Sequence, residues 1–413
     1  MEQHGISKLD LKRRNRMQVL KILKQRGPTS RIDIATTLEL TRAAVTIITN
    51  EMIEQGIIME IGEYKHVSDK APRGRKKILI DINYHYKFSL GVTIEENVIS
   101  VGLTTLSGEV LDKRNRFVNV EPDEKQSVVD FIDKSIREIL NDNCLEKRQI
   151  LGIGFGIYPS VYEMFHIAMI DGVPDYSKAR EFVASFTDLP VVFGNSVKGT
   201  AMANIDFLKK KNPNFDSIIF LQYGREINFI ATHKKNPIIS YYNRTNFVDK
   251  IIVDPNSPDI CPICGRRGCV GNEITSIAVL KRIERVYSKD RTPYLYQQTG
   301  GDKKKIKGEI IISSYQNGDK EIVNILDRAT NLMAMLINNL YFITDPQKIV
   351  LHLFYFDSDF AFQMLKESVK NIAGKEVSEK LEFSMVENKH RFLSGCALAV
   401  RELFFEKGGF VDN

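Results

Sequence analysis

Apolar residues near the N-terminus of the chain recur with the three-to-four-residue spacing of α-helices. This spacing predicts a first helix over residues 11–26, which Gly27 and Pro28 end. Ser30 and Thr41 are types that cap helix N-termini, and each is followed by Arg and then by a helical apolar pattern. Two short helices separated by a tight turn are therefore expected, which is the arrangement of a helix-turn-helix.

The two short helices carry apolar residues at positions that would pack together across the turn. The first is expected to bury Ile32, Ile34, Ala35 and Leu38, and the second Val45, Ile48, Met52 and Ile53. Glu39 stands at the turn position where helix-turn-helix proteins often have glycine, and a left-handed backbone is less favourable for it.

Two alternating runs follow the second of these helices. IIMEIGEY (57–64) and KKILIDI (76–82) each place apolar side chains on one face, which is the pattern of paired strands. They predict the wing of a winged helix, with a basic stretch beside its tip. The alternative is a small helical bundle with a solvated, charged hairpin.

The outer face of the second short helix and the helix N-termini carry side chains suited to DNA. The residues expected to meet base edges in a major groove are Arg42, Ala43, Thr46 and Asn50. The residues expected to contact the DNA backbone, at helix N-termini and on the wing, are Ser30, Arg31, Thr41, Arg73 and Arg75.

The apolar pattern changes from residue 84 onward. Residues 88–118 predict three strands separated by turns, and residues 127–140 predict an amphipathic helix. The apolar runs ILGIGFGI, LPVVFG and SIIFLQYG then alternate with helical segments, which predicts an α/β domain. The order repeats, with a cysteine loop, long helices, a late strand in DPQKIVLHLFYF and a closing helix over residues 391–407.

Length and charge agree with this division. The chain has 413 residues, too many for a single core, and its net charge of +6 is concentrated near the N-terminus. We expect a DNA-binding head over residues 1–83, an α/β lobe over 84–200 and a second lobe over 201–413 whose closing helix returns to the first. No apolar run approaches the ~20 residues of a membrane span, and five cysteines form no disulfide framework, so a cytoplasmic protein without membrane contact is expected.

A series of segments resembles the motifs of the ROK family (repressor, open reading frame, kinase). The segments are LGVTIEENVISVGLTTLSGEVL, LGIGFGIYPSV, LPVVFGNSVKGTAMAN, IVDPNSPDICPICGRRGCVG and ITDPQKIVL, in this order. With the head before them, they are similar to the family's sugar-responsive repressors. The resemblance implies an N-terminal winged helix-turn-helix followed by a two-lobed, actin-like ATPase fold with ligand bound between the lobes.

The residues that the family's kinases use are replaced in this sequence. Thr93 stands where the phosphate-binding turn has Asp, and Glu95 and Glu96 would repel phosphate. The catalytic Asn-Asp pair reads Asn195-Ser196, and a serine without a partner cannot serve as the base. We therefore expect no enzyme activity and no ATP cofactor.

The resemblance also locates ligand positions. Of the residues that hold a hexose in the family's repressors, Asn195 remains, whereas Lys250 and Gly271 replace a histidine and a glutamate. Asn195 and Lys250 are the candidate ligand residues, and Lys250 would suit an anionic effector such as a sugar phosphate. A solvated surface charge is the alternative interpretation of Lys250.

Three cysteines form a cluster in Cys261-Pro-Ile-Cys264-Gly-Arg-Arg-Gly-Cys269, with two glycines that allow a tight knuckle. Three thiolates in nine residues suit tetrahedral zinc in a structural role. The family supplies a histidine as fourth ligand where this chain has Lys250, so the fourth ligand would be Asp249, Asp254, Asp259 or water. A metal-free loop of reduced thiols is the alternative.

Together these features predict a DNA-binding transcriptional regulator, expected to be a repressor. Its partners would be a double-stranded DNA operator, a sugar or sugar-phosphate effector and a second copy of the chain, as a homodimer or a larger tetramer. The alternative is a DNA-binding regulator whose ROK-like domain is a ligand-free scaffold for dimerisation or for a protein partner.

Overall fold

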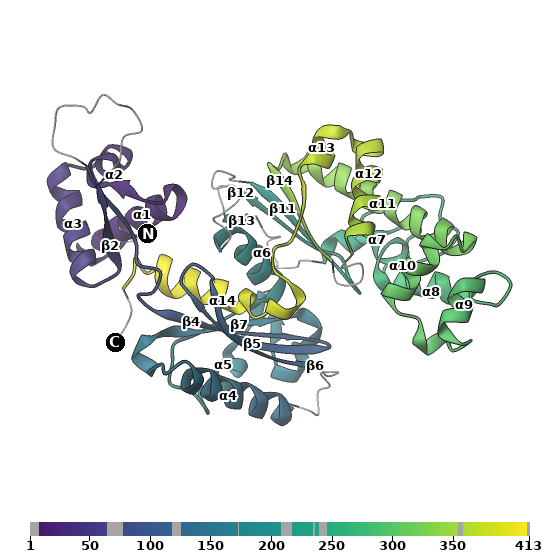
Figure 1. The fold of residues 1–413 in the computed structure, drawn as a ribbon, viewed down its shortest axis with the longest axis horizontal. Helices are drawn as coiled ribbons and strands as arrows, with labels where there is room; N and C mark the ends of the chain where they lie inside the picture. Colours follow the sequence, from purple (N-terminus) through teal and green to yellow (C-terminus); the bar gives the residue numbers. More distant parts are fainter. Residues whose placement is uncertain are drawn as a thin grey trace. The chain divides into compact units, whose positions relative to one another are not determined.

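The computed structural model in Figure 1 contains two compact units. The first unit comprises Met1–Ala168, Asp175–Asn214 and Lys389–Asn413, and the second comprises Met169–Pro174 and Phe215–Asn388. The structure describes residues 8–63, 77–117, 125–171, 173–207, 217–233, 236–238, 246–353 and 358–410. None of the helices within these ranges combines the length and the apolar character that a membrane crossing requires.

The head of the first unit contains three helices and a three-stranded sheet. These are α1 (Lys8–Arg26), α2 (Arg31–Leu38), α3 (Arg42–Glu54), β1 (Thr29–Ser30), β2 (Ile58–Glu63) and β3 (Ile78–Ile82). β2 pairs antiparallel with β3, which confirms that the two alternating runs form a hairpin, and β1 adds to the other side of β3. The segment between β2 and β3 that carries Arg73 and Arg75 lies outside the described residues.

The head core forms largely as the apolar periodicity predicts. Ile34, Ala35, Val45 and Met52 are buried, together with one face of α1. The prediction for Ile32 is wrong, because its side chain is 39% exposed. An eight-residue helix has room for only a narrow buried stripe, and Ile32 lies beside that stripe rather than on it.

The lobe of the first unit is built on a five-stranded sheet in the order β10-β7-β4-β5-β6. β4 pairs antiparallel with β5 and parallel with β7. Its strands are β4 (Phe88–Glu95), β5 (Val98–Thr105), β6 (Val110–Phe117), β7 (Ile150–Ile157) and β10 (Val191–Asn195). Its longer helices are α4 (Lys125–Asp142), α5 (Ser177–Val183) and α6 (Ser196–Asp206). A short hairpin of β8 (Ala168–Ile170) and β9 (Val173–Asp175) lies mostly within residues 169–174, which belong to the second unit.

The closing helix packs directly on this sheet (Figure 1). It consists of α14 (Leu393–Ala399) and a π-helical continuation over Val400–Phe405. A Cβ atom at Gly91 or Gly154 would collide with the backbone of this helix, so glycine is required in both strands. The close approach places Arg391, just before α14, beside the end of β4.

The second unit repeats the sheet of the first. The order is β13-β12-β11-β14-β15, again three antiparallel strands followed by two parallel ones. These strands are β11 (Ile218–Tyr223), β12 (Asn228–His233), β13 (Asn236–Ile238), β14 (Lys348–Leu353) and β15 (Leu381–Phe383). The helices are α7 (Val270–Glu273), α8 (Ser276–Val286), α9 (Pro293–Thr299), α10 (Gly308–Gln316), α11 (Lys320–Thr344), α12 (Asp359–Ala373) and α13 (Lys375–Glu379).

Candidate DNA interface, ligand positions and metal site

Local capping fixes the ends of the two short helices. Ser30 Oγ accepts a hydrogen bond from Asp33 N at 3.2 Å, and Thr41 Oγ1 accepts one from Ala44 N at 3.2 Å. Glu39 adopts the left-handed conformation, with φ of 55°, and ends α2. The turn between the helices therefore has the backbone that the sequence pattern required, although its residue is not glycine.

The outward face of α3 carries the side chains expected to read bases. Arg42, Ala43, Thr46 and Asn50 are all exposed, whereas Val45 and Met52, on the opposite face, are buried. Thr41 is exposed at the N-terminus of the helix. The fold thus brings the predicted base-contacting residues together on one accessible surface, which we call the α3 face.

Arg31 and Asn50, which were expected to contact DNA separately, contact each other. Arg31 Nη2 lies 3.2 Å from Asn50 Oδ1 and 2.8 Å from Glu60 Oε1, and Arg31 Nε donates to Thr49 Oγ1 at 3.1 Å. The guanidinium therefore connects α2 to α3 and to the hairpin. It positions Asn50, whose Oδ1 already accepts one hydrogen bond.

Ser30 is engaged in a local network. Its hydroxyl donates to Asp33 Oδ2 at 2.6 Å while accepting from Asp33 N, and Lys77 Nζ forms an ion pair with Asp33 Oδ1 at 2.9 Å. The hydrogen bond from Ser30, together with Lys77, holds the pKa of Asp33 below its usual range. The Ser30 hydroxyl proton is thus used in the cap rather than directed at a phosphate.

Charge separates the head from the rest of the chain. Residues 1–83 contain 16 lysines and arginines against 10 aspartates and glutamates, whereas the remaining residues contain 42 of each. The whole net charge of +6 therefore lies in the part of the chain that carries the α3 face. A positive head favours a polyanionic partner.

The head is held against the closing segment of the same unit. Arg16 is fully buried, donates from Nε to Gly408 O at 2.9 Å and from Nη2 to Gln55 Oε1 at 2.8 Å, and stacks on Phe410. Burial lowers the pKa of Arg16 below its usual value. Lys24 forms an ion pair with Asp206 of α6 at 2.8 Å. These contacts join the head to the helices that pack on the lobe sheet.

The strand end where the family's kinases hold phosphate is filled by side chains of this chain. Thr93 Oγ1 donates to Arg391 O at 2.9 Å, and Arg391 Nη1 donates to Glu95 Oε2 at 2.8 Å. Glu95 is buried, and burial raises the pKa of its carboxyl group. The Thr93 hydroxyl and the Glu95 carboxylate at this strand end therefore already have partners within the chain.

Asn195 and Ser196 likewise face the interior of the first unit. Asn195 Oδ1 accepts from Val197 N at 2.8 Å and caps α6, so this oxygen is already used by the fold. The Ser196 side chain is fully buried, and its hydroxyl has no hydrogen-bond partner among the described residues. No described group is in place to take a proton from it.

Residues 224–228, which follow β11, stand where the family's kinases have a second phosphate-binding turn, and their backbone also makes internal contacts. Ile227 N donates to Asp249 Oδ1 at 3.0 Å, and Gly224 O accepts from Ser276 N at 2.9 Å. Burial raises the pKa of Asp249 to about 7. A backbone N–H that could bind phosphate therefore already has a carboxylate acceptor.

Lys250, the other candidate ligand residue, lies at the end of a short 3₁₀ helix (Phe247–Lys250) and is exposed. Its neighbour Asp249 lies against Gly271. The exposure of Lys250 agrees with the surface-charge alternative as well as with a ligand role.

Sequence reasoning missed Glu273, the most completely buried carboxylate of the second unit's charged cavity. Glu273 Oε2 lies 2.8 Å from Arg282 Nη2 and 2.6 Å from Arg328 Nη1, and Glu273 Oε1 accepts from Ser257 Oγ at 2.6 Å. These residues line a cavity of about 270 Å³. The signal was an acidic residue two positions beyond Gly271, close to the position where the family has a glutamate.

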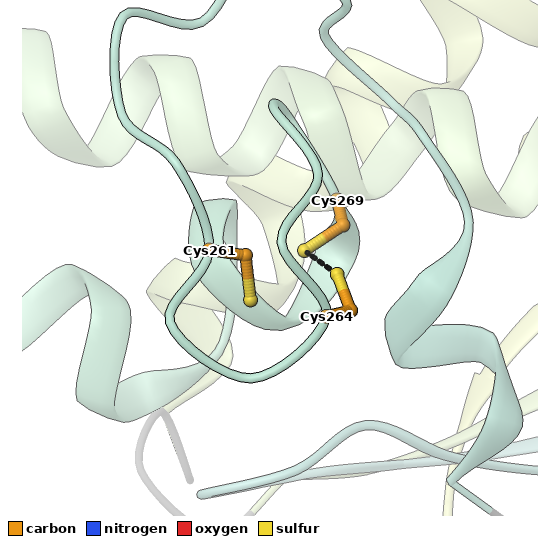
Figure 2. Close-up of side chains that lie close together, drawn as sticks. All are labelled: Cys261, Cys264 and Cys269. Atoms are coloured by element: carbon orange, nitrogen blue, oxygen red, sulfur yellow. Dashed lines mark hydrogen bonds between the residues drawn. The ribbon is translucent and has the colours of Figure 1, made fainter.

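The three cysteines converge as their spacing predicted (Figure 2). Their sulfur atoms all lie within 4.8 Å of one another, and the Cys264 and Cys269 sulfurs are 3.6 Å apart. Tetrahedral zinc with Zn–S bonds of ~2.3 Å needs sulfurs at about this separation. Burial acts to raise the pKa of Cys261, but hydrogen bonds from the backbone N–H groups of Cys264 and Ile263 and from the two neighbouring thiols together lower it.

The knuckle geometry depends on two glycines with left-handed backbones. Gly265 has a φ of 69° and Gly268 a φ of 63°, and a Cβ at Gly268 would collide with Asp254 O. Asp254 Oδ2 instead pairs with Arg328 Nη2 at 2.5 Å, and Asp259 Oδ2 with Arg285 Nη1 at 3.2 Å. With Asp249 bonded to Ile227, these contacts account for all three candidate aspartates, and the cluster found within the described ranges contains the three cysteines alone.

Comparison with known proteins agrees with this arrangement. The model of the ROK family matches residues 89–399. The xylose repressor of Caldicellulosiruptor bescii is 21% identical over 413 residues, covering 95% of this chain and 97% of that protein.

Two solved structures share the fold. A ROK family transcriptional regulator described as a homolog of the E. coli MLC protein has a TM-score of 0.72 at 19% identity, covering 96% of this chain and 97% of that one. A ROK family glucokinase from Streptomyces griseus, in complex with glucose and AMPPNP, has a TM-score of 0.59 at 16% identity, covering 76% of this chain and 99% of that one. These similarities show that the predicted fold class is correct.

Proposed function

We propose that this chain, which belongs to the ROK family, is a DNA-binding transcriptional repressor whose ROK domain responds to a sugar or sugar derivative. The observation that carries the proposal is the α3 face: a capped helix, exposed on its outer side, within the part of the chain that holds the whole net positive charge. Similarity to a xylose repressor over 95% of the chain supports both the repressor role and a sugar effector.

The α3 face would enter a major groove, with Arg42 and Asn50 meeting base edges. Arg31 and Thr41 would lie near the DNA backbone, and so would the wing that carries Arg73 and Arg75. Two copies of the chain would read the two halves of a palindromic operator. In this assignment residues 1–83 form the DNA-binding domain. Residues 84–200 and 201–413 form the two lobes of the effector-binding domain, and the closing helix returns to the first lobe.

The protein is proposed to have no kinase activity. The would-be catalytic base is Ser196, whose buried hydroxyl has no described partner, and the Ile227 N–H of the second phosphate turn is already bonded to Asp249. A nucleotide phosphate would have to displace the Asp249 carboxylate before it could bind the Ile227 N–H.

Thermal unfolding of the full-length protein with a panel of monosaccharides and sugar phosphates tests the effector proposal. A ligand that binds only the folded state at 100 times its Kd stabilises it by ~2.7 kcal/mol, which raises the melting temperature. We expect at least one sugar or sugar phosphate to do so and to change affinity for operator DNA. Equal melting temperatures across the panel would contradict a sugar-controlled ROK domain.

A second candidate function is favoured by the internal use of Asn195 Oδ1 and the Ile227 N–H. In that case the ROK domain is a ligand-free scaffold for dimerisation or for a protein partner. This version keeps sequence-specific DNA binding but predicts no response to any member of the sugar panel. The same experiment therefore distinguishes the two.

The cysteine cluster is proposed to hold structural zinc. The short sulfur–sulfur separations and the backbone N–H groups beside Cys261 support this assignment. Metal analysis should find about one zinc per chain, lost in Cys264→Ser but kept in Cys144→Ser, because Cys144 is exposed and outside the cluster. Well-folded wild-type protein without zinc would refute the assignment.

A further inference from the structure

The α3 face contains an apolar side chain that the head core does not use. Ile47 is 69% exposed, whereas Val45 and Met52 of the same helix are fully buried. Ile48 and Ile53 are partly buried and pack against the core cluster of the head. Ile47 therefore stands on the outer side of α3, away from the apolar stripe that packs on the head core.

Two small side chains adjoin Ile47 on this surface. Ala43 lies one helical turn before it, and Thr46 lies three residues after Ala43, so the three share one face. Ala43 and Thr46 are both exposed. The Thr46 hydroxyl donates to Arg42 O at 2.7 Å, so its proton is used within the helix. Together these residues form an apolar strip on the outer side of α3.

The partner that best fits such a strip within a positively charged head is thymine. The thymine C5-methyl group is the apolar group that base pairs present in the major groove, and alanine, threonine methyl and larger apolar side chains contact it. Arg42 and Asn50, the polar residues beside the strip, are types that bind base edges, and Thr41 caps the helix N-terminus. Charge and neighbours therefore favour DNA over an apolar protein surface.

We propose that Ile47, assisted by Ala43 and Thr46, is a specificity-determining residue that packs on thymine methyl groups in each operator half-site. The operator would carry thymine at the positions that the strip covers. This inference rests on the proposed DNA-binding function and adds to it the identity of the base and the chemical group that is recognised.

Methyl removal from the DNA tests the contact. Duplexes that bind full-length protein are first enriched from a random-sequence pool, and each thymine of the consensus is then replaced by deoxyuridine, which lacks only the methyl group. Affinity is measured for the wild type, for Ile47→Ala and for Ile32→Ala. Ile32 is the matched control because it is an exposed isoleucine of α2 rather than of α3.

We expect deoxyuridine at one or two positions of each half-site to weaken wild-type binding about four-fold, the value of one buried methyl group. At these positions Ile47→Ala should lose most of that discrimination, whereas Ile32→Ala should keep it. Ile47→Val, which retains a smaller branched side chain, should lose only part of the discrimination. This conservative variant keeps the test informative if Ile47→Ala does not fold.

Equal deoxyuridine effects in wild type and in a folded Ile47→Ala variant would overturn the inference while leaving DNA binding intact. A change in oligomeric state on Ile47→Ala, measured by light scattering and without any change in the deoxyuridine response, would mean that the strip packs on a second copy. Failure of any duplex to be enriched would instead refute the proposed function, and the inference with it.

Discussion

The α3 face and two turns of the ROK domain use their polar groups in opposite ways. The turns, at Glu95 and at residues 224–228, stand where the family's kinases bind phosphate. On α3, Arg42 and Thr46 are exposed on an accessible surface. At the turns, Glu95 pairs with buried Arg391, and Asp249 accepts the Ile227 N–H. The α3 face leaves its side chains exposed to a partner, whereas the polar groups at the two turns bond to other groups of the same chain.

Under the proposed lack of kinase activity, this difference explains how the fold keeps its stability without a bound nucleotide. A buried polar group left without a partner costs ~1–3 kcal/mol, so a turn that no longer binds nucleotide is more stable once side chains satisfy it. Thr93, whose hydroxyl donates to Arg391 O, shows such a replacement in the first unit. The α3 face avoids this cost, because its exposed polar side chains can hydrogen-bond to water in the absence of DNA.

The largest expected effect follows from breaking an internally satisfied charge. Glu273→Ala leaves Arg282 and Arg328 without their buried carboxylate partner and should destabilise the second unit by about 3 kcal/mol. Glu273 itself is fully buried, but the Arg328 side chain is 38% exposed, which keeps the effect at the low end of the range. Urea unfolding at neutral pH measures the change in the free energy of unfolding.

The matched control for this substitution is Glu181→Ala. Glu181 pairs with Lys178 on the surface, where its side chain is 67% exposed. Such pairs contribute ~0.2–1 kcal/mol at most. Equal destabilisation by the two substitutions would mean that the buried network around Glu273 does not stabilise the protein.

A smaller effect in free energy, but a decisive one for function, is expected on the α3 face. Arg42→Ala should weaken binding to the enriched duplex by ~1–3 kcal/mol, or roughly 5- to 150-fold, without changing the melting temperature. Arg137→Ala is the control, because this 74% exposed arginine lies on α4 of the lobe. Unchanged operator affinity of Arg42→Ala would show that α3 is not the reading helix.

The cap of α2 should give a modest, pH-dependent effect. The pKa of Asp33 is lowered in the folded protein by Ser30 and Lys77, so its stabilising contribution is present above the unfolded pKa of about 4 and is lost as pH falls through the folded value. Asp33→Asn should therefore destabilise the head at pH 7 and make less difference at pH 3. Hydrogen exchange of α2 amides measures this, and a difference that grows in acid would contradict it.

No measurable effect is expected from nucleotide. ATP with magnesium should leave the melting temperature unchanged, because the Ile227 N–H is bonded to Asp249 and Glu95, at the end of β4, is paired with Arg391. Calorimetric titration provides an independent check. A clear rise in melting temperature with ATP would mean that the turns at Glu95 and at residues 224–228 can give up their internal contacts and bind nucleotide. The contrast with the α3 face would then be wrong.

Much of this could be predicted from the sequence because it depends on local rules. Caps at Ser30 and Thr41, the left-handed turn at Glu39 and the convergence of the cysteines all follow from residue type and spacing. The repeated sheet order agrees with alternating apolar runs. The ROK fold class follows from the order of the motifs.

What the sequence could not show depends on contacts between distant residues. The pairing of Arg31 with Asn50, the network around Glu273 and the use of the Ile227 N–H by Asp249 have no periodic signal. Ile47 was absent from the predicted base-contacting residues because an apolar residue in a helix is ordinarily assigned to the core. The spacing of Val45, Ile48 and Met52 already leaves Ile47 off the buried stripe, and the structure adds that its side chain is exposed.

The most direct test of the account is the affinity of full-length protein for its enriched duplex relative to a scrambled duplex of the same composition. Fluorescence anisotropy at about 0.15 M salt keeps non-specific charge attraction comparable for the two. A sequence-specific repressor should prefer the enriched duplex by at least about 1,000-fold. A ratio near one would mean that the head binds DNA only through its charge, and it would contradict the proposed function.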